Sequence, residues 1–278
     1  SRAVPLRLTL ADVALRLRQE QPSDPIDVRM TSRLTGGAAG RLEARGRITI
    51  GERNSPSLDG TVLLAGVTLE EWQGLLPAGG GGPILSGPFS GEVRVAGPPG
   101  EAALNGELDL TQTAIRIGGA LRKPAGEEAR VTFQGRREGA GFRCTACTLR
   151  FRDMTLESTV HLADLRVPRL TFSASSPKVS VDRLLAPGAS RRTQGGGGMA
   201  WAAPPPSAPV EASTALIVQG RVTVAEVTYG ALAWSGVEAD VRYQSGVLRL
   251  SEVRGVFAQG PFRGQGAVDL RQRIPRLS

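Results

Sequence analysis

The sequence predicts an all-β fold: an elongated, curved, mainly antiparallel sheet or open trough of many short strands, with one or two short helices. Two observations predict this fold. Apolar residues alternate with polar or charged residues in run after run, which is the period of a half-buried strand. Glycine occurs 36 times and proline 19 times. The glycines fall mostly between the alternating runs, where turns are needed.

The C-terminal region shows the alternation most clearly. Val237, Ala239 and Val241 alternate with Glu238 and Asp240, so one face of this strand is apolar and the other is charged. Neighbouring runs repeat the pattern, and short glycine-containing turns separate them. The apolar residues of this region that we expect to share one face are Leu216, Val218, Val222, Val224, Val237, Ala239, Val241, Leu248, Leu250, Val268 and Leu270.

The N-terminal part is predicted to form strands with the same alternation. Residues 4–17 indicate two strands with a register change near Ala11 and Asp12. A strand follows around Val28, and Gly36 and Gly37 open a hairpin into the next strand. The remaining predicted strands of residues 1–186 cover 41–50, 58–64, 89–95, 103–110, 114–117, 129–134, 142–152, 154–162 and 169–173.

Three segments depart from the strand pattern. Residues 68–76 predict a helix, because Thr68 and Glu71 fit a capping box and an apolar stripe follows at helical spacing. Packing of that stripe against the sheet is favoured over partner binding. Residues 180–185 predict one helical turn. Residues 187–212 are a Gly/Pro-rich linker. It separates a β-rich region (1–186) from a C-terminal β-meander (213–278), which we expect to complete the same sheet.

The chain is basic, with a net charge of +8. A nucleic-acid interface would need a continuous positive track with interleaved aromatic rings. Instead the arginines occur singly on the outward side of strands, as Arg41, Arg45 and Arg47 do between Leu42, Ala44 and the next apolar positions. The pattern is typical of solvated strand faces, so we expect no nucleic-acid partner. The same charge could attract anionic lipid headgroups.

The two cysteines, Cys144 and Cys147, have the spacing of a redox pair or of half a zinc site. A redox pair normally begins a helix, whereas these residues lie in a predicted strand. A zinc site needs about four ligands, and His161 is the one histidine, so we expect no metal. Residues three apart on a regular strand point to opposite faces, so a disulfide would require a bulge or turn. A local disulfide and two unpaired thiols both remain open.

The sequence offers little for catalysis. One histidine excludes most Ser-His and Cys-His schemes, and the acidic residues occur singly on strand exteriors. The glycine run 79–82 lacks the Lys-Ser/Thr of a phosphate-binding loop. We therefore expect a protein that is not an enzyme and needs no cofactor.

Several segments resemble the AsmA family of Gram-negative envelope proteins, which includes relatives of TamB and YhdP. The hairpin at 237–250 and the strand at 262–270 resemble the C-terminal region of that family. Residues 123–126, followed by the strand 129–133, resemble its middle section. The family usually shows a Gly-Gly pair before the last strand, where this chain has Gln259, Gly260 and Pro261. The resemblance covers about two thirds of the chain, in pattern more than in invariant residues.

The resemblance implies a periplasmic domain whose full-length protein is anchored in the inner membrane. Its hydrophobic groove would shield acyl chains of phospholipid or other lipids, supporting lipid transport between the inner and outer membranes and outer-membrane biogenesis. The groove lining would be the eleven apolar residues given above. The chain opens on Ser1 and Arg2 without a methionine or signal peptide, so we expect a fragment.

Two alternatives stay open at this point. A protein-interaction module could use exposed strand edges to aid the biogenesis of outer-membrane proteins, with envelope or outer-membrane proteins as partners. A spacer with a closed apolar core is the other, because a closed core and an open groove share one alternating pattern.

Overall fold

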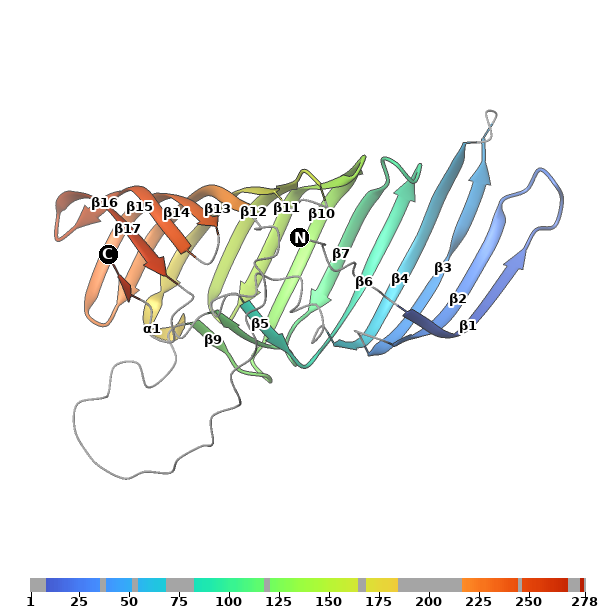
Figure 1. Cartoon of the computed structure of the whole chain (residues 1–278), viewed down its shortest axis with the longest axis horizontal. Helices are drawn as coiled ribbons and strands as arrows, with labels where there is room; N and C mark the ends of the chain where they lie inside the picture. Colours follow the sequence, from blue (N-terminus) through green and yellow to red (C-terminus); the bar gives the residue numbers. More distant parts are fainter. Residues whose placement is uncertain are drawn as a thin grey trace, which may run out of the picture.

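The structure is a computed structural model that describes residues 9–35, 39–51, 55–68, 83–117, 121–164, 169–184, 217–244, 247–269 and 276–277. Fifteen strands form one large curved sheet, whose order follows the chain from β1 at one end to β18 at the other (Figure 1). The first and last strands do not pair with each other, so the sheet is an unclosed trough. This confirms the predicted fold class.

The strands of the large sheet are β1 (Thr9–Arg18), β2 (Ile26–Thr35), β3 (Gly40–Ile50), β4 (Pro56–Thr68), β6 (Pro88–Gly97), β7 (Ala103–Asp109), β10 (Ala129–Glu138), β11 (Gly141–Phe151), β12 (Met154–Leu162), β13 (Arg169–Ser180), β14 (Ile217–Tyr229), β15 (Leu232–Gln244), β16 (Val247–Phe257), β17 (Gly260–Asp269) and β18 (Arg276–Leu277). A small sheet contains β5 (Pro83–Ser86), β8 (Ala114–Ile117) and β9 (Leu121–Lys123).

The predicted register change near Ala11 does not divide β1 into two strands, although residues 4–8 of the first predicted strand lie outside the described residues. The expected register change is present as a bulge between Ala11 and Ala14, so the pairing with β2 continues on both sides of it. Asp12 lies in this bulge with φ of 50°, and its carboxylate is 3.1 Å from the guanidinium of Arg33 on β2. A bulge accommodates the extra residue without ending the strand.

Neighbouring strands of the large sheet are antiparallel, with one exception. β13 and β14 pair in parallel, with Leu170 beside Val218 and Ser176 beside Val224. Parallel neighbours need a long crossover connection, and the chain between Ser180 and Ile217 supplies it. The predicted helical turn is confirmed at the start of this connection as α1 (Val181–Leu184). β14 to β18 therefore continue the same sheet.

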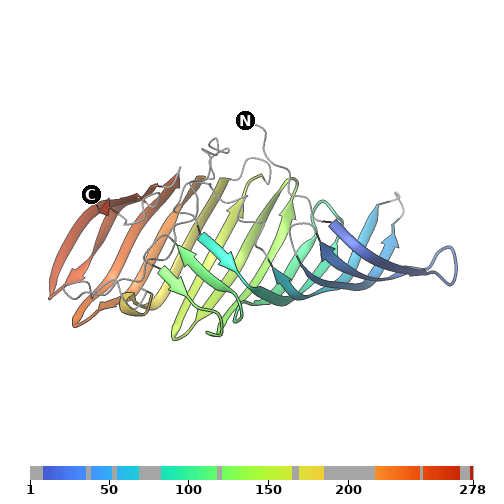
Figure 2. The ribbon, with the colours of Figure 1, turned by 60° about the horizontal axis from the view of Figure 1, so that its bottom comes forward.

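The three strands of the small sheet join the large sheet at the same end of its strands (Figure 2). β5 leads into β6, β8 follows β7, and β9 precedes β10. We call these strand ends the small-sheet rim, and the other ends the opposite rim. Lys123 lies buried at the small-sheet rim, where its Nζ donates to the carbonyls of Thr111, Thr113 and Pro124 at 3.1, 2.7 and 3.2 Å.

The predicted helix at 68–76 lies outside the described residues, except that Thr68 ends β4 as a strand residue. The linker at 187–212 also lies outside them. Among the residues that the structure describes, no helix is long and apolar enough to cross a membrane.

Candidate functional site

One face of the large sheet is apolar along its whole length. Paired residues on neighbouring strands point to the same face, so the register defines rows that cross the sheet. The central row runs from β1 to β17 and contains only apolar residues, glycines and one cysteine. Its members are Leu17, Val28, Gly46, Gly60, Val95, Leu104, Gly135, Cys144, Val160, Phe172, Gly220, Val241, Leu250 and Gly266.

The adjacent row on the same face is also uncharged and holds Leu15, Met30, Ala44, Val62, Val93, Gly106, Phe133, Cys147, Ser158, Ala174, Val222 and Ala239. We call the face that carries these two rows the apolar face.

The structure brings most of the predicted lining residues together on the apolar face. These are Val218, Val222, Val224, Val237, Ala239, Val241, Leu248 and Leu250. Val268 pairs with Leu248 in the backbone register. Leu216 and Leu270 lie outside the described residues. The predicted set covers only the C-terminal end of the face, whereas the rows continue to β1.

Burial on the apolar face is greatest at the small-sheet rim. Ala129 is 1% exposed, and Val67, Phe89 and Phe151 are also buried there. Val67 and Phe89 pack in a cluster with Leu34. Away from this rim most apolar side chains are only half-buried, because no second sheet layer lies over them in the described part of the chain. The apolar face is therefore covered at one rim and accessible over much of its area.

Two glycines hollow the apolar face where β3 meets β4. Gly46 and Gly60 are direct neighbours in the central row, and neither contributes a side chain. A cavity of about 210 Å³ lies over them, with a lining that includes Val28, Val62 and Val95. A Cβ on Gly46 would lie 2.5 Å from the carbonyl oxygen of Asp59, so this position excludes larger residues.

Phenylalanine rings occupy the space beside other glycines of the apolar face. A Cβ on Gly220 would lie 2.5 Å from the ring of Phe172, its partner on β13. Phe133 covers Gly106 on β7 in the same way. Each ring fills the space that the missing side chain of its glycine leaves.

A bulge places both cysteines on the apolar face. The register shifts between Cys144 and Cys147, so Cys144 pairs with Val160 and Cys147 pairs with Ser158. The bulge meets the condition that a local disulfide requires, although both thiols are free in this structure. Burial, and then the neighbouring Cys147, raises the pKa of the Cys144 thiol. A raised pKa disfavours the thiolate and hence a nucleophilic or redox-catalytic role.

The other face of the sheet is charged and solvated. Cross-strand ion pairs lie on it, such as Arg221 with Asp240 at 2.8 Å and Arg254 with Glu238 at 2.6 Å. The hydrogen bond from Arg221 holds the pKa of Asp240 below its ordinary value. Exposed pairs of this kind add little stability, but they keep this face hydrated. We call it the charged face.

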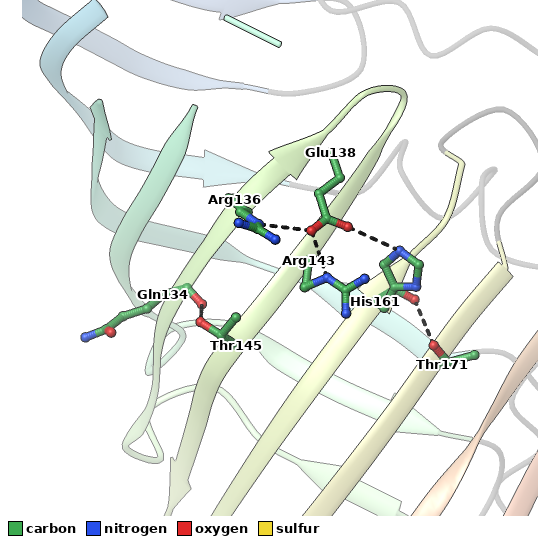
Figure 3. Close-up of polar contacts among 7 residues, drawn as sticks. All are labelled: Gln134, Arg136, Glu138, Arg143, Thr145, His161 and Thr171. Carbon is green, nitrogen blue, oxygen red and sulfur yellow. Dashed lines mark hydrogen bonds and ion pairs between the residues drawn. The ribbon is translucent and has the colours of Figure 1, made fainter. Parts of the chain in front are cut away.

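The one histidine belongs to an ion-pair cluster near the opposite rim (Figure 3). The Glu138 carboxylate accepts hydrogen bonds from Arg136 at 2.9 Å and Arg143 at 2.8 Å, and lies 3.7 Å from Nε2 of His161. The pKa of Glu138 lies below its ordinary value, chiefly because the carboxylate accepts the hydrogen bond from Arg143. Within the described ranges no group of three His, Cys, Asp or Glu residues could hold a metal ion.

Comparisons with protein-family models, with curated proteins and with solved structures found no match for this chain.

Proposed function

We propose that this protein binds lipid acyl chains on its apolar face and shields them from water. The observation that carries the proposal is the central row, which crosses fourteen strands of an unclosed sheet without a charged residue. A monomeric protein rarely leaves a continuous apolar surface of this length exposed unless it binds an apolar partner there. The row has no convergent polar groups, which fits an aliphatic chain better than a polar small molecule.

The dimensions and energies of the face fit acyl chains. Strands about 4.8 Å apart give the central row a length of roughly 60 Å, and an acyl chain spans about 15 Å of a bilayer leaflet. Several chains could therefore lie along the face. Each buried methylene contributes about 0.8 kcal/mol, so a chain of about fifteen carbons gains on the order of 10 kcal/mol before the entropic costs of binding. Reversible binding is the expected result.

The resemblance to the AsmA family supports a more specific form of the proposal. In this form the domain lies in the periplasm and carries phospholipid between the inner and outer membranes, and it is not an enzyme. An open trough suits such a role, because a lipid can enter and leave along its length without a conformational change.

A charge placed on the central row tests the proposal. Val241 lies between Gly220 and Leu250 in that row, so Val241→Asp would leave a hydrated carboxylate on the face. An acyl chain that lies along the central row places roughly four methylenes within one strand spacing of about 4.8 Å. Losing their burial costs about 3 kcal/mol, or roughly a hundredfold in affinity. Fluorescence titration with a fluorescent fatty acid measures the change.

Ser173→Asp is the matched control, because Ser173 is exposed on the charged face and pairs with Arg221. It adds the same charge without touching the apolar face. The proposal expects near-normal binding by the control and a large loss for Val241→Asp, with both variants folded by circular dichroism. Equal affinities for the two variants, or no saturable binding by the natural protein, would refute it.

The outer edge of β1 favours protein interaction as a second candidate function. Among the described residues, β1 pairs on one side only, with β2. Its Leu15 and Leu17 are 57% and 59% exposed. An unpaired edge with apolar side chains can accept a strand from another protein. A proline at an outward amide of β1 would abolish that pairing and leave fatty-acid binding unchanged.

A further inference from the structure

A second hollow lies on the charged face near the opposite rim. Its volume is about 380 Å³, and strands β12 to β15 form its floor. The register aligns four polar side chains across it, since Arg242 pairs with Gln219, Gln219 with Thr171, and Thr171 with His161. Arg169, two residues before Thr171 on β13, completes the polar lining. The other lining residues are Ala163, Leu170 and Ile217.

The lining is rich in hydrogen-bond donors and contains no carboxylate. Two guanidinium groups, an imidazole, a hydroxyl and an amide surround the hollow. Asp164 follows Ala163 in the chain but does not line it. Of the nearby carboxylates, Asp240 is held by Arg221 at 2.8 Å. Glu138 is held by Arg143 at 2.8 Å and lies 3.7 Å from the lining residue His161. The hollow is therefore a local excess of positive charge.

The two arginines of the hollow belong to those arginines of the charged face that form no ion pair with another described residue. Arg221 and Arg254 each form an ion pair with a carboxylate on the neighbouring strand. Within the part of the chain that the structure describes, Arg169 and Arg242 form no ion pair. Arg242 donates only to the neutral amide oxygen of Gln244, at 3.2 Å. Both guanidiniums can thus turn to an incoming anion without breaking an ion pair.

We propose that this hollow binds a phosphate group, held by Arg169 and Arg242 with Thr171 and Gln219 as further donors. Guanidinium groups match phosphate oxygens with two parallel hydrogen bonds, and such charge-assisted bonds are stronger than neutral ones. The volume exceeds that of a phosphate ion, so a phosphate ester fits the hollow. The proposal does not depend on acyl-chain binding, because the hollow lies on the charged face.

Phosphate in this hollow could come from a lipid headgroup or from a soluble phosphate ester. Isothermal titration calorimetry with inorganic phosphate, and separately with a short-chain phosphatidic acid below its micelle concentration, distinguishes the two. The double variant with Arg169→Gln and Arg242→Gln tests the site. The matched control is a variant with Arg29→Gln and Arg150→Gln, two exposed arginines of the same face that do not line the hollow.

The proposal expects saturable binding by the natural protein, weakened at least tenfold in the hollow variant and less than twofold in the control. Equal affinity for both ligands would mean that the phosphate group alone is recognised. Stronger binding of phosphatidic acid, also lost in the hollow variant, would identify a lipid headgroup. Absence of saturable binding, or equal weakening in the two variants, would overturn the proposal, since net charge alone would then account for any attraction.

Discussion

Replacing Lys123 by methionine should destabilise the protein by about 3 kcal/mol. Its side chain is 3% exposed, and its Nζ donates to three backbone carbonyls at the small-sheet rim. Each hydrogen bond from a charged group contributes about 1.5–3 kcal/mol. Burial opposes the charged form and lowers the pKa of Lys123, which offsets part of that sum. Methionine keeps the volume of the side chain but leaves the carbonyls without this donor.

The chain provides its own control, because Lys178 is its one other lysine. Lys178 pairs with Glu226 at 2.8 Å, and its side chain is 51% exposed. Lys178→Met should therefore cost less than about 1 kcal/mol. Urea unfolding measures both changes, and hydrogen exchange should show faster exchange in residues 111–124 of the Lys123 variant alone. Equal losses in the two variants would refute the role assigned to Lys123.

Three further predictions test other parts of the structure. Gly220→Ala should cost about 1–3 kcal/mol in urea unfolding, because its Cβ would lie 2.2 Å from a backbone carbonyl oxygen of β13. Oxidised glutathione should convert Cys144 and Cys147 to an intramolecular disulfide, releasing two equivalents of reduced glutathione; two thiols that still react with iodoacetamide would contradict this. Asp240 has a lowered folded-state pKa, so its contribution is present above the ordinary value of 3.8 and is lost as pH falls towards the folded value. The Tm of the Asp240→Asn variant should therefore fall less between about pH 5 and pH 3 than the Tm of the natural protein. An identical fall in Tm would count against the pairing of Asp240 with Arg221.

Alternation predicted the all-β class and the shared face of the C-terminal strands, because the side-chain period of a strand is two. The bulges can also be recognised in the alternation of apolar residues along the sequence. The bulges between Cys144 and Cys147 and between Leu250 and Val253 lie where the apolar alternation slips by one residue. Only the slip near Ala11 was interpreted in this way from the sequence. The other bulges could have been predicted by locating, in each alternating segment, the position at which the apolar residues shift by one.

Other features depend on long-range pairing and could not be predicted from local pattern. Whether a sheet closes depends on the accumulated twist and curl of all its strands, so the alternating pattern by itself could not separate an open groove from a closed core. The parallel pairing of β13 with β14 depends on how the chain between them returns to the start of β14. The sequence of that connection shows no alternation from which its path could be predicted. The buried, hydrogen-bonded position of Lys123 could not be predicted either, because the carbonyls that hold it converge only when the small sheet forms.

The most direct test of the central claim is mass spectrometry of lipid extracted from the purified protein. An unrelated β-protein prepared identically serves as the reference. An accessible apolar face should retain phospholipid through purification, and Val241→Asp should remove most of it while Ser173→Asp retains it. A lipid-free natural protein, or equal lipid in both variants, would contradict acyl-chain binding and favour interaction through the β1 edge.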